Sequence, residues 1–394
     1  MRIIELQNIK EVEQELKKIG VDPGGIKIMA PKSIFRAIKL KDVKTISANI
    51  IKQEMLSYGG EAATSYGTID HSAKTTDILL VGTLQQFKLL ANKLKLHQFG
   101  LPEISKLIEQ ALSNYSSSPA PIKIKNKNLS FGKRTYVMGI LNVTPDSFSD
   151  GGKFISVKDA VAQADRMIKD GADIIDIGGE STRPGAKKVS EQEEIKRTIP
   201  VIKELKKRNI IISIDTRKSG VAYAAIKAGA NIINDISGLK FDKNMAKTAA
   251  NLKVPVIIMH MRGNPENMQK NTQYSDIIAD IMAELDKSIK IAQNAGIEKI
   301  IIDPGFGFSK TPEQNLEILK RLKEFKSLGL PILIGTSRKS TIGHVLGLPP
   351  AKRLEGTIAT VVVAILAGAD IIRVHDVLEM KRAAKMADAI IGRS

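Results

Sequence analysis

The segment Gly171-Ala-Asp-Ile-Ile175 recurs along the chain as Gly229-Ala-Asn-Ile-Ile233 and Gly368-Ala-Asp-Ile-Ile372, with a looser copy at Gly296-Ile-Glu-Lys-Ile-Ile-Ile302. Each Gly follows a stretch whose apolar residues have helical spacing, and each leads into a short run rich in β-branched residues. A Gly that ends a helix just before an apolar strand is typical of buried parallel β-structure. The repeat therefore predicts alternating helices and parallel strands.

Extending the pattern outward from these copies gives eight strand–helix units. The expected strands are 136–142, 173–179, 210–216, 232–237, 255–261, 299–305, 331–337 and 370–375. The expected helices are 157–170, 191–208, 218–228, 243–252, 275–295, 313–326, 354–367 and 377–390, and two of them begin at capping sequences, Ser190 with Glu193 and Thr311 with Gln314. Eight such units predict a (β/α)8 TIM barrel. An open doubly wound sheet is less well supported, because no Gly-x-Gly-x-x-Gly follows the first strand.

A smaller α/β domain is expected before the barrel. Ser116-Ser-Ser-Pro-Ala-Pro121 combines turn formers with residues that favour extended backbone, so it indicates a linker. Residues 1–115 are then an N-terminal α/β extension, 116–133 the linker and the approach to the barrel, and 134–394 the barrel. The extension contains helical patterns at 8–19, 43–57, 84–95 and 103–113 around apolar runs at 26–30 and 78–81. None of these patterns indicates a chemistry.

The composition limits the class of protein. Of 394 residues, 43% are hydrophobic, which is enough for a sizeable core. The net charge of +18 is spread along the chain with few aromatic residues, so Lys-rich helix faces explain it better than nucleic-acid binding does. The lack of Cys excludes disulfides and thiolate chemistry. A cytoplasmic protein without membrane segments is expected, because the chain has neither a signal sequence nor a long uninterrupted apolar run.

Polar residues gather at the carboxyl ends of all eight expected strands, while Ile, Val and Leu make up the strand interiors. Active sites of (β/α)8 barrels form at this end. The strand ends are Asn142 with the loop to Gly152, then 178–185, 215–218, 234–235, 259–262, 303–311, 335–340 and 373–376. The sequence therefore predicts an enzyme site at this mouth of the barrel.

Three acceptors at these ends, Asp215, Asn234 and Asp303, belong to strands that converge on one mouth, near Lys339. A buried carboxylate needs a partner because losing its hydration is costly. A ligand with two adjacent N–H donors, such as the edge of a 2-amino-4-oxopyrimidine, supplies one in bidentate form. Metal binding by the carboxylates is the alternative, although the Lys and the Asn favour a heterocycle.

Arg373 and His375 lie two residues apart on one strand, so their side chains share a face and can both donate to an anion. Late strands of such barrels commonly hold a phosphate. The other candidates have structural interpretations: His260 and His344 are expected to be packed or partly exposed, and Asp235 is as easily a helix cap as a ligand.

Taken together, these strings resemble the dihydropteroate synthase family over roughly residues 134–394. The resemblance rests on Asn142-Val-Thr-Pro-Asp-Ser-Phe-Ser-Asp-Gly-Gly152, Gly178-Gly-Glu-Ser-Thr-Arg-Pro-Gly185, Asp303-Pro-Gly-Phe-Gly-Phe308, Ser337-Arg-Lys-Ser340 and Arg373-Val-His-Asp376. It implies a transferase that condenses 6-hydroxymethyl-7,8-dihydropterin diphosphate with p-aminobenzoate in folate synthesis. Ser309 is a slight departure, because many members have Gly there.

The resemblance also implies roles for individual residues. Asp215, Asn234, Met259, Asp303, Lys339 and Arg373 correspond to the pterin site; Asn142, Arg373 and His375 to the diphosphate site, with Asn142 beside Mg²⁺; and Thr182, Arg183, Pro184, Phe308 and Ser340 to the p-aminobenzoate site. Catalysis is assigned to Asp215, Asp303, Lys339, Arg373 and His375, and Asp146, Ser147 and Phe148 belong to a mobile first loop. The family further implies a homodimer that sulfonamides target.

Two other functions remain open from the sequence. A pterin-dependent methyltransferase shares the barrel and the pterin-binding acids, but it resembles this chain less in the first loop and in the strings at 337–340 and 373–376. A non-catalytic pterin-binding homologue would be expected to have lost site residues, and the sequence retains them.

Overall fold

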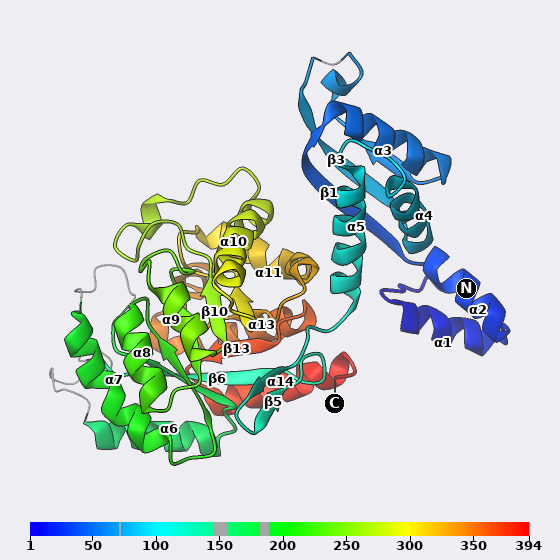
Figure 1. Cartoon of the computed structure of the whole chain (residues 1–394). Helices are drawn as coiled ribbons and strands as arrows, with labels where there is room; N and C mark the ends of the chain where they lie inside the picture. Colours follow the sequence, from blue (N-terminus) through cyan, green and yellow to red (C-terminus); the bar gives the residue numbers. More distant parts are fainter. Residues whose placement is uncertain (71, 145–155, 182–188, 394) are drawn as a thin grey trace. The chain divides into compact units, whose positions relative to one another are not determined.

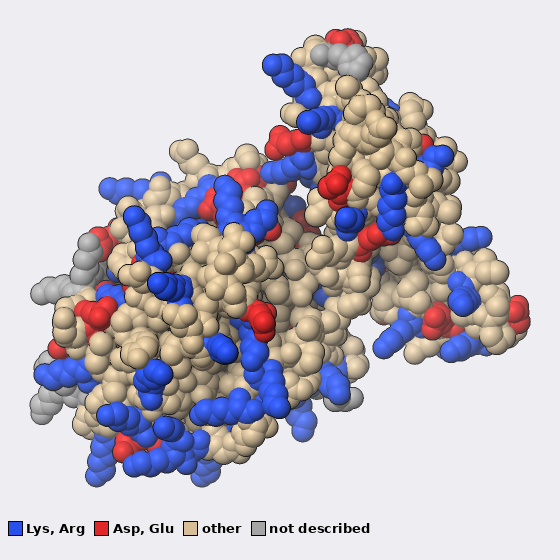
Figure 2. Space-filling view, viewed as in Figure 1, with Lys and Arg blue, Asp and Glu red and all other residues tan. Residues whose placement is uncertain are grey.

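The computed structural model describes residues 1–70, 72–144, 156–181 and 189–393. The chain divides into two compact units, Met1–Ser117 and Ser118–Ser394 (Figure 1). On the face drawn in Figure 2, Lys and Arg side chains are dispersed over the surface with Asp and Glu among them. No helix in the described ranges is long and apolar enough to cross a membrane.

The second unit is a closed parallel barrel, as expected. Its strands are β6 (Tyr136–Asn142), β7 (Ile174–Gly178), β8 (Ile211–Asp215), β9 (Ile232–Asp235), β10 (Val256–Met259), β11 (Ile300–Asp303), β12 (Leu333–Ile334) and β13 (Ile371–Val374). They are hydrogen-bonded in the order β11-β10-β9-β8-β7-β6-β13-β12. A parallel bridge between Ile302 and Ile332 joins the two ends of this order, so the sheet closes on itself. All eight strands expected from the sequence are confirmed.

Helices surround the strands (Figure 1). They are α6 (Val157–Lys169), α7 (Glu191–Leu205), α8 (Ser219–Ala228), α9 (Met245–Leu252), α10 (Ile277–Asn294), α11 (Pro312–Arg321), α12 (Ser340–Leu346), α13 (Leu354–Leu366) and α14 (Val377–Ile390). Both expected caps are present, since Ser190 accepts from the N–H of Glu193 and Thr311 forms a capping box with Gln314. The repeated Gly171, Gly229 and Gly368 all have positive φ, which explains why Gly stands between helix and strand.

Two elements in the barrel differ from the expectation. Helix α12 was not predicted, and the expected helix 313–326 ends at Arg321 and continues as a 3₁₀ helix, η5 (Leu322–Leu328). Within the stretch expected to be a linker, β4 (Ile122–Ile124) and β5 (Lys127–Leu129) form an antiparallel hairpin. Its side chains pack into the barrel core, as described next.

The barrel has an outer and an inner core. Between the strands and the helices lies a large apolar cluster. Inside the barrel, inward-facing residues near the start of each strand form a second cluster. Its strand residues are Tyr136, Met138, Ile174, Ile211, Ile232, Ile257, Ile301, Leu333 and Ile371. Ile122, Ile124, Leu129 and Phe131 from the hairpin region pack onto this cluster. The amino-terminal end of the barrel is therefore filled with apolar side chains, which leaves the carboxyl end for a site.

The first unit is a small α/β domain, as expected for the extension. It contains α1 (Ile9–Ile19), α2 (Pro23–Met29), β1 (Phe35–Lys44), α3 (Thr45–Ser57), β2 (Glu61–Ala63), β3 (Thr75–Thr83), α4 (Leu84–Leu94) and α5 (Leu101–Ser116). The antiparallel sheet has the order β1-β3-β2, and its core includes residues of α3, α4 and α5. The apolar run at 26–30 is mostly helical, because Asp22 caps α2 and Pro23 stands at its first position.

Candidate active site

Arg373 of β13 bonds to acidic residues of two neighbouring strands, β7 and β8. Its Nε donates to Oδ2 of Asp176 at 2.6 Å, and its Nη2 donates to Oδ2 of Asp215 at 2.7 Å. Asn234 donates from Nδ2 to the same oxygen of Asp176 at 3.0 Å. The structure thus brings Asp215, Asn234 and Arg373 together, as the sequence predicted, around a fourth residue that the sequence reasoning missed.

Asp176 is that fourth residue, and it corrects the expectation that strand interiors are wholly apolar. It lies in the middle of β7 and is completely buried, as is Ser213, its partner in β8. A signal was available, because an Asp inside Ile174-Ile-Asp-Ile-Gly178 is costly to bury without a function or a partner.

Burial controls the protonation of Asp215. It raises the pKa of the carboxyl group to about 7, although the nearby Arg373 guanidinium lowers it. The negative charges of Asp176, Glu194 and Asp235 raise it further. Asp215 therefore changes charge near neutral pH.

Asp303 and Lys339 form the opposite side of the mouth. Asp303 is buried, its Oδ1 accepts from the N–H of Gly305 at 2.7 Å, and its pKa is raised by burial. The pKa of Lys339 is lowered to about 8, chiefly by burial and against the attraction of Asp303. Lys339 donates to the carbonyl of Phe306, and its Nζ lies 4.5 Å from the ring centroid of Phe308.

An apolar wall stands beside these polar groups. It consists of Ile236, Met259, Met261 and Met268, with Phe308 packed against them. Met259 and Phe308 were predicted site residues, and the wall brings them together. The other members were not predicted, because Met and Ile at inward positions cannot be told from ordinary core residues by sequence.

His375 directly follows β13 and is held by the loop that follows the neighbouring strand β12. Oγ of Ser337 lies 3.0 Å from Nδ1 of His375 and also accepts from the backbone N–H of His375 at 3.2 Å. Arg373 and His375 come from the same strand end two residues apart, as expected for an anion site. Ser340, by contrast, is an exposed residue at the start of α12.

Asn142 ends β6 and is partly buried. A Cβ built on the neighbouring Gly178 would lie 3.7 Å from Oδ1 of Asn142 and 3.8 Å from Oδ2 of Asp215. Gly178 thus keeps space open between these two side chains. No cluster of three or more His, Asp or Glu that could hold a metal ion occurs in the parts of the chain that the structure describes.

Thr182, Arg183 and Pro184 of the second loop, and Asp146, Ser147 and Phe148 of the first, lie outside the described residues. Of the remaining candidates, Asp235 accepts from the N–H groups of Ser237 and Leu239 and so stabilises a turn. His344 is exposed at the rim, with Nε2 3.6 Å from Glu313.

His260 is packed, as expected, and helps to shape the loop after β11. Lys310 donates from Nζ to Nδ1 of His260 at 3.0 Å and to the carbonyls of Gly305 and Phe308. Burial lowers the pKa of His260 to about 3, so the ring is neutral and its Nε2 donates to Glu284 at 3.1 Å. This network fixes the loop that carries Phe308.

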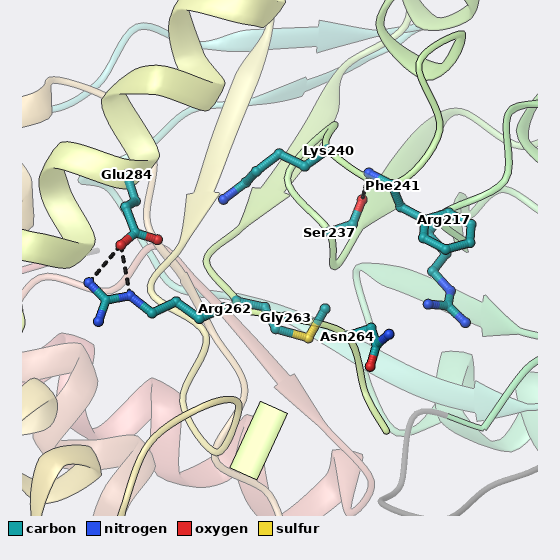
Figure 3. A pocket seen from close by; sticks show the side chains of 9 residues that line it. Arg217, Ser237, Lys240, Phe241, Arg262, Gly263, Asn264 and Glu284 are labelled. Atoms are coloured by element: carbon teal, nitrogen blue, oxygen red, sulfur yellow. Dashed lines mark hydrogen bonds and ion pairs between the residues drawn. The ribbon is translucent and has the colours of Figure 1, made fainter. Parts of the chain in front are cut away.

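A cavity of about 320 Å³ opens next to the apolar wall, outside the cluster around Arg373 (Figure 3). Met261 belongs both to the apolar wall and to the lining of the cavity. The cavity is lined by Arg217, Ser237, Lys240, Phe241, Met261, Arg262, Gly263, Asn264 and Glu284. Figure 3 shows Arg262 paired with Glu284, and these two groups are 2.7 Å apart.

The fold and these groups define a class of protein, a (β/α)8 barrel whose mouth carries carboxylates, an amide and cationic side chains, the arrangement typical of enzyme sites in such barrels. Residues 138–375 match a protein family described as pterin binding enzyme. Dihydropteroate synthase of Clostridium beijerinckii is 55% identical over 276 residues, which are 69% of this chain and 100% of that protein. The chain belongs to the dihydropteroate synthase family. It is accordingly a transferase of folate synthesis, and the methyltransferase alternative finds no support.

Solved structures agree with this assignment. Dihydropteroate synthase from Clostridium difficile, studied in the presence of pteroic acid, is 54% identical with a TM-score of 0.63, covering 66% of this chain and 98% of that one. Another relative reaches over the N-terminal unit as well. It is a probable bifunctional folylpolyglutamate synthase/dihydropteroate synthase of Halobacterium salinarum, 40% identical over 390 residues, which are 98% of this chain and 46% of that protein.

Proposed function

We propose that the pterin ring of 6-hydroxymethyl-7,8-dihydropterin diphosphate binds to Asp215, Asn234, Asp303 and Lys339. One observation carries this proposal: Asp215, whose side chain is 12% exposed, and Asp303, which is buried, are carboxylates with raised pKa values at the ends of β8 and β11. Such groups gain most from a ligand that brings N–H donors into the site. The apolar wall offers the ring a flat surface through Met259.

Arg373 and His375 bind the diphosphate in this proposal. The arylamine nitrogen attacks the methylene carbon of the pterin substrate, the carbon–oxygen bond to diphosphate breaks, and the amine releases one proton to the solvent. Negative charge develops on the departing diphosphate, and a positioned guanidinium and imidazole stabilise it. Positive charge develops on the pterin, where the carboxylates of Asp215 and Asp303 stabilise it. No side-chain nucleophile is needed, because the arylamine is the nucleophile.

Mg²⁺ is assigned to Asn142. An amide oxygen is a hard ligand, and Mg²⁺ commonly combines few protein ligands with substrate phosphates and water. Gly178 places no side chain against Oδ1 of Asn142, which lies 3.7 Å from where a Cβ of residue 178 would be. When bound, the ion would help to neutralise the charge of the leaving group.

The arylamine is proposed to be p-aminobenzoate, bound near Phe308 and Ser340. Thr182, Arg183 and Pro184 are proposed to complete this site. Phe308 is partly buried and lies beside the Nζ atom of Lys339, so an aromatic amine can pack where the pterin site ends. The enzyme is proposed to act in the cytoplasm.

A homodimer is proposed through helices α11, α12 and α13. These neighbouring helices expose apolar side chains: Leu316, Val345, Leu346, Val363 and Leu366. Exposed apolar patches of this kind commonly mark protein–protein interfaces.

The reaction is tested with the purified chain, the pterin diphosphate and p-aminobenzoate. Release of diphosphate and formation of dihydropteroate are expected together, and Arg373→Ala should lower kcat/KM by about a hundredfold or more. A matched control is Asp370→Asn, a buried substitution at the amino-terminal end of the barrel that should leave kcat/KM unchanged. Near-native turnover by Arg373→Ala would overturn the role assigned to this residue. Methyl transfer without diphosphate release would overturn the proposed reaction.

A further inference from the structure

Asp176 occupies a level of the barrel below the residues assigned to the pterin. Ile174 belongs to the inner apolar cluster, so Asp176, two residues further along β7, also faces the barrel axis. The carboxylate is completely buried. A buried charge at this place has to be explained by the groups it touches.

One oxygen of Asp176 serves two partners from opposite directions along the sheet. Oδ2 accepts from Nε of Arg373 at 2.6 Å and from Nδ2 of Asn234 at 3.0 Å. Arg373 lies in β13 and Asn234 in β9, two strands that are not neighbours of each other. A single carboxylate therefore fixes the orientation of both Arg373, assigned to the diphosphate, and Asn234, assigned to the pterin.

The contact also decides which way the amide of Asn234 points. An ionised carboxylate only accepts hydrogen bonds, so Asn234 must turn its NH₂ group towards Asp176. Its Oδ1 is then directed elsewhere and is available as an acceptor. Asn234 consequently offers an oxygen, rather than a donor, to a ring in the site.

The other oxygen of Asp176 argues against a purely structural role. Oδ1 is buried and has no hydrogen-bond partner among the described residues. Leaving buried polar atoms unpaired costs stability, so a residue selected only for the fold would be apolar or fully paired here.

We propose that Asp176 is a positioning residue, which orients Asn234 as an acceptor and fixes Arg373, so that the site selects rings bearing N–H donors. The proposal rests on the proposed function, because it assumes that Asn234 faces the pterin. In this proposal Asp176 acts on the substrate through Arg373 and Asn234, its two hydrogen-bond partners.

The test uses Asp176→Asn in the full chain, with Ser213→Ala as a matched control for a buried polar change in the same level. Binding of 6-hydroxymethylpterin and of its analogue without the 2-amino group is measured by titration calorimetry. Asp176→Asn should weaken binding of the aminated ring by about tenfold to a hundredfold and reduce the preference over the analogue. Ser213→Ala should change neither value, and urea unfolding should show that both variants fold.

A double-mutant cycle separates positioning from a general structural defect. In an Asn234→Ala background, Asp176→Asn should cost clearly less pterin affinity than it does in the wild type, because its partner is already gone. Equal losses in both backgrounds, or an unchanged preference for the aminated ring, would overturn the inference. Failure of the proposed function looks different, since Asn234→Ala and Asp303→Asn alone would then bind the pterin normally.

Discussion

Asp303→Asn gives the sharpest test of the pterin site. The change keeps the shape of the side chain but replaces a charged acceptor with an amide that presents donors as well. Asp303 is buried, and Oδ1 already accepts from Gly305 at 2.7 Å, so water cannot readily replace a lost contact. Removing one partner of a buried charged hydrogen-bonded pair costs about 2–5 kcal/mol, or roughly thirtyfold to several thousandfold in Kd.

Stability should change in the opposite direction, which distinguishes this result from misfolding. Burial raises the pKa of Asp303, so keeping it ionised at neutral pH opposes folding, and the neutral Asn removes that cost. Asp370→Asn is the matched control, because Asp370 is also buried and its pKa is raised to about 6.

The expected effect of Asp370→Asn on stability has a definite sign and size. An acid whose pKa is higher in the folded state destabilises the fold at pH values above that pKa, and Asp370→Asn should remove up to about 3 kcal/mol of such destabilisation. Calorimetry with 6-hydroxymethylpterin and urea unfolding at pH 7.5 measure both effects. Native pterin affinity in Asp303→Asn, or an equal loss in Asp370→Asn, would refute the reasoning.

Three further outcomes are expected. The pH profile of kcat/KM should be bell-shaped, falling below about pH 7 as Asp215 becomes protonated and above about pH 8 as Lys339 loses its charge. Lys339→Arg should remove the alkaline limb of this profile. A flat profile would contradict these pKa values. Chelation of Mg²⁺ should slow diphosphate release but leave the affinity for 6-hydroxymethylpterin unchanged, as judged by calorimetry, and Asn142→Ala should do the same. Ile124→Ala in the hairpin should lower the free energy of unfolding by about 2–5 kcal/mol without changing pterin affinity, and a smaller loss would mean that the hairpin does not seal the barrel.

The alternation of strands and helices could be predicted because each unit repeats local signals. Gly171, Gly229 and Gly368 mark the ends of helices through a backbone conformation that other residues avoid, and β-branched runs follow them. The hairpin at 122–129 gave no comparable signal. Its strands are three residues each, too short for a periodicity, and their apolar side chains acquire a partner only when the barrel closes.

The sequence pointed to site residues that stand at the carboxyl ends of strands and missed Asp176, which lies inside a strand. Asp215, Asn234, Asp303 and Arg373 stand at strand ends, which the barrel geometry makes neighbours in any sequence of this type. Arg373 and Asp176 are 197 positions apart in the chain and meet only when the barrel closes, so no local sequence pattern indicates their pairing. Ile236, Met261 and Met268 were missed for a different reason, because their chemistry is that of the core.

The two ends of the barrel interior serve different purposes: the amino-terminal end stabilises the fold, and the carboxyl end carries the site. Apolar side chains and the hairpin fill the amino-terminal end, and together with the outer core they supply the free energy that holds the barrel closed. That stability allows the level above to contain Asp176 and Ser213, which carry unpaired buried atoms, and the mouth to contain carboxylates whose ionisation is unfavourable. A ring with N–H donors offsets the free-energy cost of burying ionised carboxylates at the mouth. The groups that destabilise the fold without a ligand are therefore the groups that select the ligand.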